Sequence, residues 1–184
     1  MLWDFSQPCR LFRSRKLQRQ ALKIGELILN PRANQNNLLR KMYQKDPYLH
    51  KNHSLHYLQM AFLSDKHEIM ENPDGYGKRT GTYGDTVEMF IRVRNERIQS
   101  VTFISHGCIN TYACANTVAL LAEGKTINKA WEITPEKVAS YLKTLPKEDL
   151  LCAELAAGSL YLALVNYREH KYYPLKKLNR HRFR

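Results

Sequence analysis

Hydrophobic residues recur at helical spacing in the first third of the chain, where two helices are predicted. The first ends at Asn30-Pro31, because the residue before a proline disfavours the helical conformation. The second runs from about Ser54 to Met70 and is closed by Asn72-Pro73. The first helix has one apolar and one basic face, formed by Leu17, Ala21, Ile24 and Ile28 against Arg15, Arg19 and Lys23.

The hydrophobic period then changes to two, which predicts an antiparallel hairpin. Apolar residues from Val87 to Val93 alternate with mostly polar neighbours, as in a strand with one buried face. The sequence RNER at 94–97 predicts a turn, and the segment 98–105 returns as a second strand. A short third strand is expected near residues 76–80.

Helical spacing returns at residue 110 and continues to the end of the domain. Thr134-Pro135 supplies an N-cap and a first-turn proline for one of these helices. Strands followed by helices predict an α+β fold, with a small antiparallel sheet of about three strands covered by helices. The predicted helices cover about 110–122, a short segment from Thr126, 134–142 and a long segment after Pro146.

Basic residues are concentrated at the two ends of the chain. Residues 1–61 contain 11 Lys and Arg against 3 Asp and Glu, and residues 171–184 contain 6 against none. We therefore predict a basic helical N-terminal extension (1–61), a near-neutral domain (62–170) and a basic C-terminal tail (171–184). The ends suit an acidic partner such as RNA or an anionic membrane surface, or simply keep the protein soluble.

The chain start lacks the pattern of a secretion signal, since no apolar stretch is followed by a small-residue cleavage site. No apolar run approaches 18 residues, so we predict no membrane span. We expect a cytoplasmic protein, or an organelle-matrix protein if the Arg-rich leader is a transit peptide. The cysteines are expected to be free thiols or metal ligands in a reducing compartment; they are Cys9, Cys108, Cys114 and Cys152.

Three side chains at the ends of predicted elements are candidate metal ligands. Asp85 opens a strand after the turn sequence GTYG. Cys108 follows Gly107 at a strand end and leads into a helix, whose N-terminus favours the thiolate. Cys152 lies near the start of the long helix. Each also has a purely structural explanation, because aspartate forms turns and cysteine packs as a small apolar residue.

Two further residues lie close to these candidates in the sequence. His106 is either a fourth ligand or a surface histidine. Cys114 lies six residues after Cys108, about 240° around a helix, so the two cannot face one ligand. We assign Cys114 to the core. The sequence contains no Gly-x-Ser-x-Gly, P-loop or dinucleotide fingerprint, so no enzyme is predicted.

The order of the motifs resembles the U-type iron–sulfur cluster scaffold family, represented by IscU and the N-terminal domain of NifU. The motifs are "SDKHEIMENPDGYG", Gly-x-x-Gly-Asp before a hairpin, "HGC" before a helix, "EGKTINKAWEI" and "LCAELA". The resemblance covers about residues 62–168. It implies a domain that assembles a nascent [2Fe–2S] cluster on three cysteines and an aspartate, and in which zinc often occupies the same site. Sulfur would come from a cysteine desulfurase, and the cluster would pass to acceptor proteins.

The resemblance also implies which residues hold the cluster. Asp85, Cys108 and Cys152 match three of the family's ligand positions. The family's first cysteine corresponds to Tyr83, and the residue before the third cysteine, often histidine, corresponds to Leu151. A [2Fe–2S] cluster is usually held by four protein donors, whereas zinc accepts mixed Cys, His and Asp ligands.

Three functions therefore remain open from the sequence. The first is a scaffold that binds iron, a labile cluster or zinc. The second is a module that binds no metal and docks a desulfurase or another assembly component. The third is a nucleic-acid-associated protein that uses its basic ends to bind phosphates.

Overall fold

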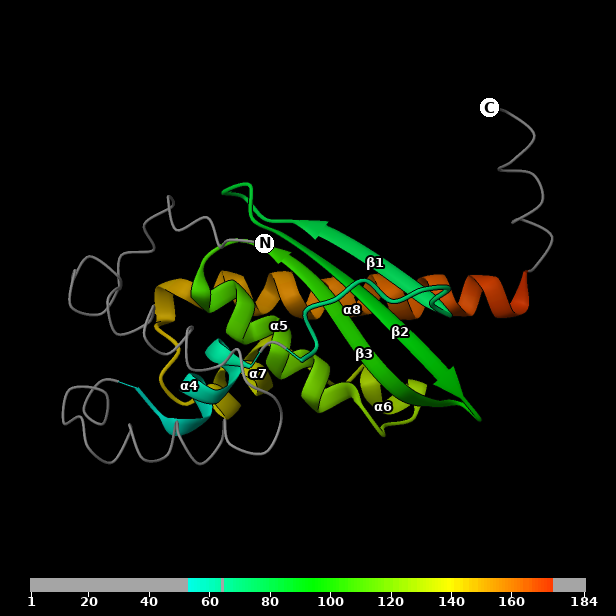
Figure 1. Cartoon of the computed structure of the whole chain (residues 1–184), viewed down its shortest axis with the longest axis horizontal. Helices are drawn as coiled ribbons and strands as arrows, with labels where there is room; N and C mark the ends of the chain where they lie inside the picture. Colours follow the sequence, from blue (N-terminus) through cyan, green and yellow to red (C-terminus); the bar gives the residue numbers. More distant parts are fainter. Residues whose placement is uncertain (1–52, 64, 174–184) are drawn as a thin grey trace.

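The computed structural model describes residues 53–63 and 65–173 (Figure 1). The predicted helix carrying Leu17 and Ile28, the leader that resembles a transit peptide, and most of the basic C-terminal tail lie outside the described residues. What the sequence predicts for those segments stays a prediction.

The described chain forms one antiparallel sheet in the order β1-β2-β3, followed by helices. This confirms the predicted α+β fold and its three strands. The elements are α4 (Leu55–Phe62), β1 (Gly75–Thr80), β2 (Thr86–Arg94), β3 (Arg97–His106), α5 (Ile109–Ala122), α6 (Ile127–Ala130), α7 (Pro135–Leu142), the 3-10 helix η2 (Lys147–Asp149) and α8 (Leu150–Tyr172).

The hairpin of β2 and β3 carries the core face that the alternation predicts. Its turn places Asn95 and Glu96 at φ values of 50° and 58°, as a tight hairpin turn requires. Met89 pairs with Phe103 in the register, and both side chains are fully buried. Helices α5 and α8 contact the sheet, and α8 crosses the strands along its length (Figure 1).

Strand β1 packs directly on the backbone of α8. A β-carbon at Gly77 would lie 2.3 Å from the carbonyl oxygen of Ser159 and 2.4 Å from the backbone nitrogen of Ala163. Only glycine permits this approach, and small residues on the facing side of α8 complete it. The contact fixes α8, which carries Cys152, against the sheet.

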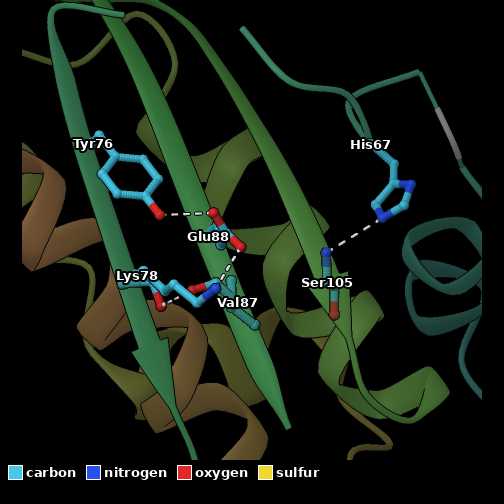
Figure 2. Close-up of polar contacts among 7 residues, drawn as sticks. His67, Tyr76, Lys78, Val87, Glu88 and Ser105 are labelled. Atoms are coloured by element: carbon cyan, nitrogen blue, oxygen red, sulfur yellow. Dashed lines mark hydrogen bonds and ion pairs between the residues drawn. The ribbon is translucent and has the colours of Figure 1, made fainter.

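The outer face of the sheet is polar along its β1 edge (Figure 2). The hydroxyl of Tyr76 donates to Oε2 of Glu88 at 2.7 Å, and Nζ of Lys78 donates to Oε1 at 2.9 Å. Burial, followed by the hydrogen bond to Glu88, raises the pKa of Tyr76 to about 12. This carboxylate therefore ties β1 to β2 on the side away from the helices.

The helix predicted from 54 to 70 is shorter than expected, because α4 ends at Phe62. The carbonyl oxygen of Leu63 accepts hydrogen bonds from the hydroxyl of Tyr112 and the Nδ2 of Asn116, each at 2.7 Å. These bonds to α5 replace the next helical hydrogen bonds and turn the chain into an extended path. The error arises because side chains from a later helix decide where this one ends.

Helix α4 shares the core of the domain. Ser54 caps it, since its Oγ accepts the N–H of Tyr57 at 3.0 Å. Tyr57, Leu58 and Met60 are buried in the same hydrophobic cluster as the sheet. Residues 55–61, which the charge pattern assigns to the extension, thus pack with the domain.

One helical segment among the described residues, Lys147–Tyr172, is long and apolar enough to cross a membrane by length and composition. The sequence predicts this long helix after Pro146 but predicts no membrane span. Half of its most apolar window is buried in the protein, and α8 contacts β1, β2, α5 and α7. The core helix of a globular domain passes the same test, and these contacts explain the apolar character of α8.

Candidate metal centre

A tight turn between β1 and β2 positions Asp85. The N–H of Gly84 donates to the carbonyl of Gly81 at 3.1 Å, and the N–H of Gly81 donates to the carbonyl of Asp85 at 2.7 Å. Gly84 has a φ of 85°, a conformation that favours glycine. Tyr83 takes no part in these bonds, and its side chain is 84% exposed. The turn therefore presents Asp85 whatever residue occupies position 83.

Cys108 is the N-cap residue of α5. Its backbone is extended, with φ −75° and ψ 173°, and its side chain makes no capping hydrogen bond. Its carbonyl accepts the N–H of Tyr112 at 3.1 Å, which is the first hydrogen bond of the helix. The positive end of the helix dipole lies at this residue and favours the thiolate form.

Cys152 lies in the first turn of α8, and a buried amide fixes that turn against α5. The Nδ2 of Asn110 donates to Oδ2 of Asp149 at 2.9 Å. Asn110 is fully buried beside Cys108, and Asp149 is the N-cap residue of α8. The starts of the two cysteine-bearing helices are therefore joined side chain to side chain.

The structure brings Asp85, Cys108 and Cys152 together. Their ligand atoms all lie within 4.8 Å of one another, and each residue is partly buried. Two ligands on a tetrahedral zinc, with Zn–S distances near 2.3 Å, are separated by about 3.8 Å. A small closing movement would thus let the three donors share one ion. No fourth His, Cys, Asp or Glu of the described segments joins this group.

Thr111, which the sequence motifs did not single out, contacts all three candidate ligands. The hydroxyl of Thr111 lies 2.8 Å from Oδ2 of Asp85, 3.4 Å from Sγ of Cys152 and 3.6 Å from Sγ of Cys108. Thr111 is fully buried. The signal that could have revealed it is its spacing, because residues three apart lie on the same side of a helix.

The two thiols influence each other's ionisation. The pKa of Cys152 is raised above its usual value, first by the hydrogen bond with Cys108 and then by burial and by the charge of Cys108. Two thiolates this close repel each other unless a cation lies between them. Binding of a metal ion would therefore release protons from the pair.

The remaining residues singled out in the sequence lie outside the group. His106 is exposed at the end of β3, where the strand's alternation directs it to the same outer face as Glu88. Leu151 precedes Cys152 but is 47% exposed. Cys114 is fully buried, which confirms its assignment to the core, and burial raises its pKa.

Comparison with known proteins identifies the same family as the motifs. The family model for the NifU-like N terminal domain matches residues 67–173. "Iron-sulfur cluster assembly scaffold protein IscU 1" of Archaeoglobus fulgidus is 36% identical over 99 residues, which are 53% of this chain and 65% of that protein. "Iron-sulfur cluster assembly protein IscU" of Plasmodium falciparum is 33% identical over 86 residues, 47% of this chain and 52% of that protein.

Solved structures share the fold. The N-terminal part of a nitrogen-fixing NifU-like protein from Brucella abortus matches with a TM-score of 0.53 and 12% identity, over 62% of this chain and 92% of that chain. The chain spans between about half and two thirds of the length of the two curated relatives above. The family model covers more than half of the chain and includes the turn, Cys108 and Cys152. This chain belongs to the NifU-like N-terminal domain family.

Proposed function

We propose that this chain is an iron–sulfur cluster assembly scaffold in which Asp85, Cys108 and Cys152 hold iron or a labile [2Fe–2S] cluster as cargo. One observation carries the proposal: two thiols and a carboxylate from three separate elements gather within 4.8 Å. They do so in a member of a family whose relatives named above are cluster assembly proteins. The role is binding and transfer rather than turnover.

Three protein donors leave at least one coordination position to be filled from outside the group. Tyr83 is exposed, and His106 faces the outer side of the sheet. A protein-bound cluster usually has four donors, so this site would hold its cargo weakly unless a thiol from a partner completes it. We propose that a cysteine desulfurase supplies sulfur here and that acceptor proteins remove the cluster. Zinc would use the same three donors and a water molecule.

Anaerobic reconstitution tests the proposal. Wild-type protein incubated with ferrous iron, sulfide and a thiol should acquire visible charge-transfer absorption and bound iron. Cys108→Ser and Cys152→Ser should lose both, whereas Cys114→Ala, a change of a buried cysteine outside the group, should keep them. If the wild-type protein takes up neither a cluster nor stoichiometric iron or zinc, the proposal is wrong.

A second function is favoured by the side chains of Tyr83 and Leu151, which are exposed at the two positions where the resemblance places ligands. Single exposed apolar side chains are common on protein surfaces, so this function is favoured by their positions, two residues before Asp85 and one before Cys152. A scaffold relative that binds no metal would dock a desulfurase through them. Capture by a cysteine desulfurase should then survive Cys108→Ser and weaken in Tyr83→Ser. Loss of capture in Cys108→Ser would argue against this module.

The predicted cytoplasmic location and the nucleic-acid function stay predictions. Both depend on basic segments that lie mostly outside the described residues. The names of the relatives above give the nucleic-acid function no support.

A further inference from the structure

We propose that Thr111 is a positioning residue for the metal site, and this inference rests on the proposed function. Its hydroxyl would hold the carboxylate and the two thiols in one group before metal arrives, and would keep a hydrogen bond to them afterwards. The threonine is not one of the five ligand positions that the family resemblance implies. The evidence is its position, its burial and its contacts.

The contacts of Thr111 join the site across three elements. Its Oγ1 donates to Oδ2 of Asp85 at 2.8 Å and can instead donate to Sγ of Cys152 at 3.4 Å. It also lies 3.6 Å from Sγ of Cys108, a contact in which either atom can donate. One hydroxyl thus links the turn before β2, the start of α5 and the start of α8.

Burial places Thr111 on the protein side of the site. Thr111 is fully buried, whereas the three candidate ligands are only partly buried. An ion that enters from solvent therefore meets the three ligands before it meets the hydroxyl. A threonine side chain in a helix is largely limited to two rotamers, and the hydroxyl of Thr111 takes the one that reaches Asp85.

The hydroxyl suits both the metal-free and the metal-bound state, because it can donate one hydrogen bond and accept others. Without metal, a protonated Cys108 thiol can donate to Oγ1 while the O–H donates to Asp85. With metal, both thiols have lost their protons to solvent, and the O–H still donates to one of the anionic ligands. Valine has nearly the same shape but no hydroxyl, so it can neither accept a hydrogen bond from Cys108 nor donate one to a ligand. Serine has a hydroxyl and can do both.

Thr117 provides a matched control on the same helix. It is also fully buried, but its hydroxyl donates to the backbone carbonyl of Ala113 at 2.8 Å. This bond within the helix is the usual way a buried threonine is satisfied. Thr117→Val removes a buried hydroxyl of the same kind from the same helix without touching the site.

Titration with zinc and cobalt separates positioning from a structural role. We would measure the affinity of each variant for Zn²⁺ by competition with a chromophoric chelator, and thiolate ligation by the charge-transfer absorption of bound Co²⁺. Thr111→Val should bind Zn²⁺ roughly 10–100-fold more weakly than wild type, the usual effect of losing a partner of metal ligands. Thr111→Ser should restore both the affinity and the cobalt spectrum. Thr117→Val should match wild type in both.

The outcomes are distinguishable. Equal affinities of wild type and Thr111→Val would overturn this inference and leave the proposed function standing. Equal weakening in Thr111→Val and Thr117→Val would also overturn it, because the cause would be general destabilisation. A wild-type protein that binds neither ion would overturn this inference, and failed iron reconstitution of the same protein would overturn the proposed function. If circular dichroism shows that Thr111→Val is unfolded, the Zn²⁺ affinity and cobalt spectrum of Thr111→Ala are compared with those of Thr111→Ser. The same outcomes then support or overturn the inference.

Discussion

Gly107 and Asp85 approach so closely that a side chain at position 107 would collide with the carboxylate. A β-carbon on Gly107 would lie 2.8 Å from Oδ2 and 3.1 Å from Cγ of Asp85. Gly107 is not among the glycines with positive φ, so the contact rather than the backbone conformation requires glycine. The absent side chain lets the carboxylate reach the group that contains Cys108.

Gly107→Ala should therefore weaken metal binding while the domain stays folded. The added methyl group displaces the carboxylate of Asp85 and the nearby hydroxyl of Thr111. We expect Zn²⁺ affinity to fall by about tenfold or more. The control is Gly81→Ala in the turn before Asp85, where the nearest atom would lie at an ordinary 3.4 Å. If both variants bind as tightly as wild type, the carboxylate does not contribute to the site.

Tyr83→Cys should increase the amount of iron or zinc retained after anaerobic reconstitution. The change adds a thiol two residues before Asp85, in a turn whose shape depends on glycines. Because Tyr83 is exposed, the substitution should alter stability by no more than about 0.5 kcal/mol. Metal content per chain is the measurement, and Thr82→Cys in the same turn is the control. No gain over Thr82→Cys would mean that position 83 does not face the site.

Gly77→Ala should destabilise the domain by about 1–3 kcal/mol or more, because the methyl group meets the backbone of α8 rather than a flexible side chain. Urea unfolding followed by circular dichroism measures the change. Lys78→Ala, one residue later on the outer face, is the control and should cost no more than about 1 kcal/mol as a surface ion pair. Equal losses in the two variants would contradict close packing of β1 on α8.

Stability should fall as the solution is acidified, in part because of His67. Its ring packs against Phe103 and Tyr112, with centroid distances of 5.5 and 5.3 Å, and its Nε2 accepts the N–H of Ser105 at 3.3 Å (Figure 2). Burial lowers the pKa of His67 below its usual value of 6.5. The unfolded chain therefore binds this proton at a higher pH than the folded chain does. The stabilisation that neutral His67 contributes to the folded state is present above about pH 6.5. It is lost as the pH falls toward the pKa of His67 in the folded chain.

Thermal unfolding between about pH 7 and pH 5 checks this prediction. His67→Gln should show a shallower decline of the melting temperature than wild type. Burial also lowers the pKa of His53, so part of the decline should remain. The control is His170→Gln on α8, because His170 is not among the groups that shift the pKa of His67. Parallel declines in wild type and His67→Gln would rule out a contribution from this side chain.

The sequence predicted those elements whose signals are local. The alternation around Met89 follows from the two-residue period of a strand, and Thr134 caps α7 by accepting the N–H of Lys137 at 3.4 Å. The predicted end of α4 was wrong. The observed end depends on hydrogen bonds from Tyr112 and Asn116 to Leu63, which lies about fifty residues earlier in the chain. A contact over that distance leaves no periodic pattern in the sequence.

The sequence by itself determined the strands, most of the helices and the family, and it placed three candidate metal ligands at the ends of elements. Only the tertiary structure decided that Asp85, Cys108 and Cys152 lie within reach of one ion, that His106 lies on another face, and that Thr111 contacts all three. The hydroxyl of Thr111 reaches 26 residues back to Asp85 and 41 residues forward to Cys152. Distances between such residues are set by the packing of α5 and α8 on the sheet, whereas helical and strand periodicity are set by neighbouring residues alone.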